Sequence, residues 1–137
     1  MRTAYVLIAA LAAACSSGGS TPTGTGSPSP SGESFAVAVG GSRVVPGTDV
    51  TVAFLRVEED SRCALGVLCV WAGNGRIALR LSQGVATREV ELNTTVLPRE
   101  TEFAGLRIEL QALEPYPVHA QPTDPDDYVA TFEVGND

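Results

Sequence analysis

Six stretches of the sequence carry large apolar side chains at every second position. Successive side chains of a β-strand point to opposite faces, so this period predicts half-buried strands; a helix would repeat its apolar residues every three or four positions. The predicted strands cover residues 35–39, 50–55, 77–82, 89–93, 106–111 and 128–134. No segment has the pattern of a long helix, and we therefore expect an all-β fold.

Turn-forming residues separate these predicted strands. Gly reaches backbone conformations that other residues avoid and Pro fixes φ, so both favour turns. Such residues occur at Pro46-Gly47, Gly73-Asn74-Gly75, Gln83-Gly84, Pro98 and Ala104-Gly105. Short strands joined by turns predict a small antiparallel β-sandwich of six to eight strands, immunoglobulin-like in architecture.

The first fifteen residues have a different character. One positive charge at Arg2 precedes an apolar run that is shorter than the roughly 20 residues a membrane-spanning helix needs. This order predicts a secretory signal. The end of the run, Ala12-Ala13-Ala14-Cys15, resembles the lipobox of bacterial lipoprotein signals, although Ala12 stands where Leu is more usual.

The lipobox resemblance implies cleavage before Cys15 and attachment of acyl chains to it. Two or more acyl chains would hold the protein stably on a bilayer, either on the bacterial cell surface or in the periplasm. The alternative is an ordinary signal peptide, which would leave Cys15 as a free thiol on a secreted protein.

The stretch that follows Cys15 consists almost entirely of Ser, Thr, Gly and Pro. Such a stretch has too little apolar surface to offset the entropy cost of ordering, so it predicts a disordered linker. A flexible chain of about 18 residues has a root-mean-square span of roughly 20–25 Å. The predicted division is therefore a signal peptide (1–14), an acylated cysteine with its linker (15–34) and a β-sandwich domain (35–137).

The charge of the chain excludes two classes of partner. There are 16 acidic residues against 9 basic ones, all of them Arg, and the net charge is −7. Affinity for nucleic acid depends on clustered cations that release counterions from the phosphates, so we expect no nucleic-acid partner. Adhesion to anionic lipid through a basic patch is excluded for the same reason.

Two cysteines remain after Cys15 is assigned to lipid. Cys63 and Cys69 form an even pair in a chain predicted to be exported, which is the setting in which disulfides persist. A metal site or a redox pair is the alternative. However, the single histidine, His119, lies far away in a Pro-rich stretch, and redox pairs usually have the tighter C-x-x-C spacing. We therefore predict a structural disulfide.

The residues around these cysteines form a motif, Asp60-Ser61-Arg62-Cys63 followed six residues later by Cys69-Val70-Trp71-Ala72-Gly73. It resembles a signature of short exported bacterial proteins, often lipoproteins, in which Pro usually stands at the position of Ala64. The likeness extends to residues 106–117 and 124–128. This resemblance implies export and a β fold, but that family has no established biochemical activity and so implies no mechanism.

The motif loop has two interpretations. In the first it is a scaffold, with Trp71 packed on the disulfide and the core and with Arg62 paired to Asp60. In the second it presents Asp60, Arg62 and Trp71 to a partner, because Trp and Arg are enriched in binding hot spots. Burial of Trp71 and pairing of Arg62 would favour the scaffold.

Catalysis and metal binding have weaker support. His119 is predicted to be solvated, and the chain lacks a recognisable catalytic motif, so we expect no enzyme; a hydrolase with an unrecognised site is the remaining alternative. Acidic clusters suggest a weak calcium site if they converge, and solvated charge beside strands if they do not. The candidate ligands are Glu58, Asp60, Asp124, Asp126 and Asp127.

These observations together predict a lipid-anchored envelope protein that acts as a noncatalytic binding or structural module. Its partner would be another envelope protein or a small ligand, and no cofactor is predicted beyond possible calcium.

Overall fold

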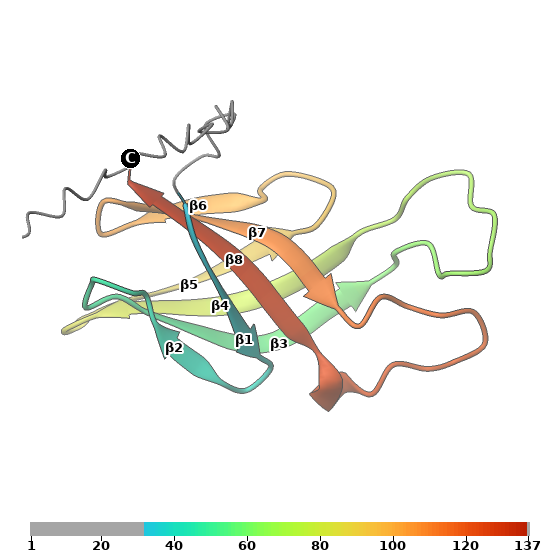
Figure 1. The fold of residues 1–137 in the computed structure, drawn as a ribbon, viewed down its shortest axis with the longest axis horizontal. Coiled ribbons are helices and arrows are strands. Elements are labelled where there is room, and N and C mark those ends of the chain that lie inside the picture. Colours follow the sequence, from blue (N-terminus) through green and yellow to red (C-terminus); the bar gives the residue numbers. More distant parts are fainter. Residues whose placement is uncertain (1–31, 137) are drawn as a thin grey trace, which may run out of the picture.

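The computed structural model describes residues 32–136, which form two antiparallel sheets packed face to face (Figure 1). The strands are β1 (Glu33–Ala38), β2 (Ser42–Val44), β3 (Thr51–Asp60), β4 (Gly75–Gln83), β5 (Ala86–Asn93), β6 (Glu100–Phe103), β7 (Leu106–Glu114) and β8 (Val129–Asn136). The predicted signal peptide, Cys15 and most of the predicted linker lie outside the described residues. Within residues 32–136, no helix has the length and apolar character needed to cross a membrane.

The chain builds the two sheets as meanders. After β1 it crosses to the second sheet, which has the order β2-β3-β4-β5, and then returns to complete the first sheet, which has the order β1-β8-β7-β6. The last strand pairs antiparallel with the first, from Glu33 opposite Val134 to Ala38 opposite Val129. The predicted antiparallel sandwich is therefore confirmed.

A single apolar core fills the space between the sheets. The alternation seen in the sequence places it: Ile77, Leu79 and Leu81 of β4 are fully buried, as are Ile108 and Leu110 of β7. Each of the six predicted strands is present. Removing these apolar side chains from water is the main favourable contribution to folding.

The sequence pattern missed two short strands and several strand ends, among them the end of β3 at Asp60 and the start of β5 at Ala86. The three residues of β2 are all exposed, and only two of the four residues of β6 are even half-buried, so neither strand carries a strong alternating signal. In addition, β1 begins at Glu33, two residues before the predicted start of the domain at Phe35. Its first two residues are exposed polar side chains that resemble the linker in composition.

Two irregularities in β3 determine which of its side chains face inward. The pairing with β4 shifts between Phe54 and Arg56 and again between Val57 and Glu59. Each shift adds one residue to β3, so the inward positions become every third residue at this end of the strand: Phe54, Val57 and Asp60. Without these bulges, strict alternation after Phe54 would turn Arg56 and Glu58 toward the core. With them, Asp60 at the end of the strand is the only charged residue of β3 that faces inward.

Candidate functional site

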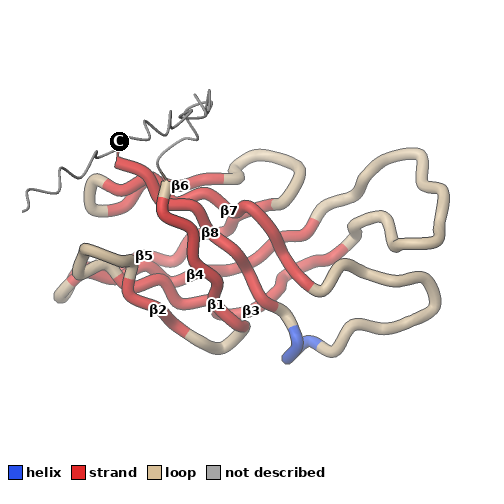
Figure 2. Tube along the Cα trace, viewed as in Figure 1, coloured by secondary structure: helices blue, strands red, loops and turns tan. Residues whose placement is uncertain are grey.

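Three loops extend from the same end of the sandwich. This end lies opposite the start of β1 and the end of β8 (Figures 1 and 2). The loops comprise residues 61–74 after β3, residues 94–99 after β5 and residues 115–124 after β7. We call these three segments together the loop end. It contains the disulfide motif and most of the residues that the sequence singled out.

A buried arginine joins two of these loops to the sheets. The side chain of Arg62 is only 4% exposed, and its guanidinium donates from Nε and Nη2 to the two carboxylate oxygens of Asp60, at 2.8 and 2.7 Å. The same group donates to the backbone carbonyls of Leu113 and, at 2.9 Å, of Pro115. It also lies over the ring of Tyr116, 4.8 Å from the centroid. The motif loop is thereby fixed to the end of β7.

The carboxylate of Asp60 is equally well satisfied. The hydroxyl of Tyr128 donates to its Oδ2 at 2.9 Å, and the backbone N–H of Arg62 donates to its Oδ1 at 3.2 Å. Burial alone would raise the pKa of Asp60, but the hydrogen bonds from Arg62 and Tyr128 and the charge of Arg62 outweigh burial and hold the pKa below its ordinary 3.8. Burial and the neighbouring carboxylate raise the pKa of Tyr128.

Two glycines allow the close packing of the backbone and the guanidinium at this site. Gly73 has a φ of +70°, and a Cβ there would lie 1.8 Å from the carbonyl oxygen of Ser61. A Cβ on Gly75 would lie 3.0 Å from Leu113 and 3.4 Å from the Nε of Arg62. The final glycine of the motif is therefore required by the close approach of the two ends of the loop.

Further bonds hold the loops to one another. Cys63 and Cys69 form the predicted disulfide. Leu65 pairs with the 115–124 loop, donating its N–H to Pro117 at 2.8 Å and accepting from the N–H of His119 at 3.0 Å. On the other side, the N–H of Thr95 donates to the side-chain oxygen of Asn74 at 3.2 Å. The loop end is a cross-linked unit.

This unit exposes apolar side chains. Eleven large apolar residues of the described chain are exposed, and nine of them belong to the loop end. They are Leu65, Val67, Leu68, Val70, Trp71, Val96, Leu97, Tyr116 and Val118. Trp71 is 78% exposed, so the scaffold interpretation is wrong for this side chain: backbone bonds and Arg62 close the loop, and the indole lies in solvent.

The structure therefore divides the motif between the two interpretations. Arg62 and Asp60 are paired and buried, as the scaffold interpretation requires, whereas Trp71 is presented to solvent, as the binding interpretation requires. Sequence reasoning missed Leu68 and Val70, both essentially fully exposed, and the role of Tyr128. The available signal was a run of apolar residues without alternation in a loop closed by two cysteines.

The remaining candidates are not gathered into one site. Among residues 32–136 no group of three or more His, Cys, Asp or Glu side chains could hold a metal ion. Asp60 is occupied by Arg62, Glu58 pairs with Arg56, and Asp124 accepts from the N–H of Asp126. His119 is exposed, and only its backbone is hydrogen-bonded to described residues.

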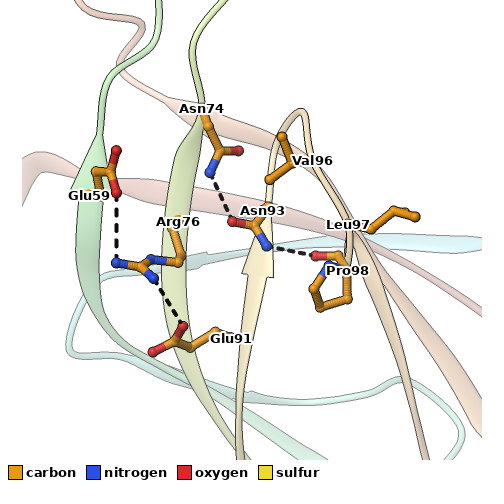
Figure 3. Close-up of a pocket in the computed structure, with 8 residues that line it drawn as sticks. All are labelled: Glu59, Asn74, Arg76, Glu91, Asn93, Val96, Leu97 and Pro98. Carbon is orange, nitrogen blue, oxygen red and sulfur yellow. Dashed lines mark hydrogen bonds and ion pairs between the residues drawn. The ribbon is translucent and has the colours of Figure 1, made fainter.

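A hollow of about 580 Å³ lies beside the loop end on the outer face of the second sheet (Figure 3). Arg76 stands between Glu59 and Glu91, at 3.7 and 3.6 Å. Asn93 accepts from Asn74 at 2.8 Å and donates to the carbonyl of Pro98 at 3.1 Å. Most of the polar side chains that line the hollow thus bind one another. Val96 and Leu97 of the loop end form part of its wall.

Fold and site together define an all-β domain with a cross-linked, apolar loop end. No protein-family model, curated protein or solved structure matches this chain. The resemblance of the disulfide motif to exported bacterial proteins therefore stays a prediction.

Replacing Arg62 with Met should lower the free energy of unfolding by about 3 kcal/mol, because Asp60 is then left as a buried charge without its partner. The matched control is Arg80→Met, since Arg80 forms an ion pair with Glu89 in which both side chains are half exposed. That variant should cost less than about 1 kcal/mol. Urea unfolding measures both, and equal losses would contradict the assigned role of Arg62.

The Asp60 carboxylate should make stability depend on pH. Because its folded-state pKa lies below 3.8, its contribution is present above about pH 4 and is lost as the pH falls through the lowered pKa. Asp60→Asn removes this titration. The difference in unfolding free energy between wild type and Asp60→Asn should therefore shrink between pH 6 and pH 3, and a constant difference would contradict the assignment.

Proposed function

We propose that this protein is an exported, lipid-anchored module of the bacterial envelope that binds a partner, without catalysis, through its loop end. The observation that carries the binding role is the exposure of Trp71, Leu68 and Val70 on a loop fixed by a disulfide and a buried ion pair. Exposed apolar surface that clusters in one place is typical of interaction sites. Trp is also one of the residue types enriched in binding hot spots.

The fixed geometry of the loop end supports a binding role on energetic grounds. Ordering a flexible loop on binding costs roughly 0.5–1.5 kcal/mol for each immobilised side chain. The hydrogen bonds of Leu65 to Pro117 and His119, together with the Arg62 contacts, order the backbone before any partner arrives. More of the free energy gained by burying the apolar side chains then contributes to affinity.

The predicted anchor supports the envelope location. Since β1 begins at the end of the sandwich opposite the loop end, a linker that runs from Cys15 into β1 does not join the domain at the loops (Figure 1). The apolar loops therefore stay accessible to other envelope components.

Cys15→Ser should remove both lipid labelling and membrane association, because the acyl chains have no other attachment point in this proposal. Cells grown with a labelled lipid precursor and then fractionated provide the measurement. The wild-type protein should carry label in the membrane fraction. Unchanged labelling and fractionation of the variant would show that Cys15 is not the anchor.

A photoreactive amino acid placed at Leu68 should form specific crosslinked adducts in living cells, because that side chain lies at the proposed interface. The same substitution at Val85 is the matched control: both side chains are fully exposed, but Val85 lies in the turn between β4 and β5, outside the loop end. Identical adduct patterns at the two positions would contradict a binding role for the loop end.

A further inference from the structure

The loop end combines an apolar centre with an acidic border. Its three loops hold few charged side chains, and the guanidinium of Arg62 is buried. Six exposed acidic residues lie at or near the places where the loops join the strands: Glu59, Glu91, Glu114, Asp124, Asp126 and Asp127. We call these six residues the acidic rim. Asp60 and Glu100 also lie at such places, but they pair with Arg62 and Arg107.

The protein's own arginines neutralise only one of the six charges of the rim. Arg76 lies between Glu59 and Glu91 and balances only one of the two. The other four acids of the rim form no ion pair with any residue in 32–136. The last arginine of this region, Arg99, pairs with Glu109 of β7. The border of the apolar surface is therefore strongly negative.

From this charge pattern we infer that the partner of the loop end is a different protein, whose binding surface is apolar at its centre and rich in Lys or Arg around it. This inference rests on the proposed binding function and names the class of partner. Interfaces commonly have such an apolar core with a polar rim, and complementary charge favours encounter and suppresses wrong partners.

Two other occupants fit less well. A second copy of this chain would bring two acidic rims together, and like charges across an interface are unfavourable. An anionic bilayer would repel the same rim.

The single tryptophan of the chain provides the readout, since Trp71 lies in the centre of the proposed interface. The sample is the full chain without its predicted signal peptide, carrying Cys15→Ser. It is titrated with an 18-residue amphipathic peptide of Leu and Lys, with the matched peptide of Leu and Glu, and with vesicles of phosphatidylcholine with or without phosphatidylglycerol.

The Leu/Lys peptide should shift the Trp71 emission to shorter wavelength and saturate, because the indole leaves water. The Leu/Glu peptide and both kinds of vesicle should have no effect. Leu68→Ser should weaken peptide binding at least tenfold, whereas Val85→Ser, which alters an equally exposed side chain elsewhere, should leave it unchanged. The comparison of these two variants separates binding at the loop end from general attraction of a cationic peptide to an acidic protein.

The rim is tested by Asp126→Asn combined with Asp127→Asn, since Asp124 is retained to cap the short turn Pro125–Asp127. This variant should weaken binding severalfold, more at low salt than at high salt. The control, Glu33→Gln with Glu102→Gln, removes the same number of charges from exposed positions outside the loop end and should have little effect.

Several outcomes would overturn the inference. A blue shift caused by vesicles would identify a lipid surface as the partner, and equal binding of the two peptides would eliminate the cationic border. A failure of every probe, combined with specific crosslinks from position 68, would refute the cationic partner and leave the binding function intact. A failure of both experiments would refute the binding function as well.

Discussion

The loop end depends on the ion pair between Asp60 and Arg62. A buried charge is costly unless it is paired and fully hydrogen-bonded, and here both groups meet that condition. The carboxylate binds the guanidinium and the Tyr128 hydroxyl, while the guanidinium also binds the carbonyls of Leu113 and Pro115. These contacts join the ends of β3 and β7 and the residue just before β8. At this end of the sandwich, where the strands continue into loops, the ion pair therefore holds the strand ends together in place of apolar packing.

This arrangement allows an apolar loop to stay exposed. A loop rich in Leu, Val and Trp would normally collapse onto the core to remove apolar surface from water. The space beneath the motif loop is instead occupied by the guanidinium, and the disulfide and the bond between Leu65 and Pro117 restrict the backbone. Leu68 and Val70 consequently remain fully exposed. Exposure of this kind is a cost to the isolated protein that burial against a partner would offset.

The strands and the core follow from the sequence almost directly. The alternation in residues 77–82 and 106–111 identified the buried side chains of β4 and β7, because the pleat of a strand is a local property. The disulfide followed from the count and setting of the cysteines. The short strands β2 and β6 lacked a local signal, since exposed edge strands need not alternate. The sequence left open whether Trp71 is buried or exposed, because it does not show what lies beneath the loop.

The sequence by itself determined an acidic, all-β domain with a short disulfide loop. Net charge follows from composition, and the two-residue alternation of a strand and the spacing of the two cysteines are local features of the chain. Only the tertiary structure decided what that loop does. The backbone carbonyls that Arg62 binds lie 51 and 53 residues further along the chain, and Tyr128 lies 68 residues from Asp60. No local pattern encodes contacts over such separations. Whether a motif arginine is buried and a motif tryptophan exposed depends on how the two sheets bring these distant residues together.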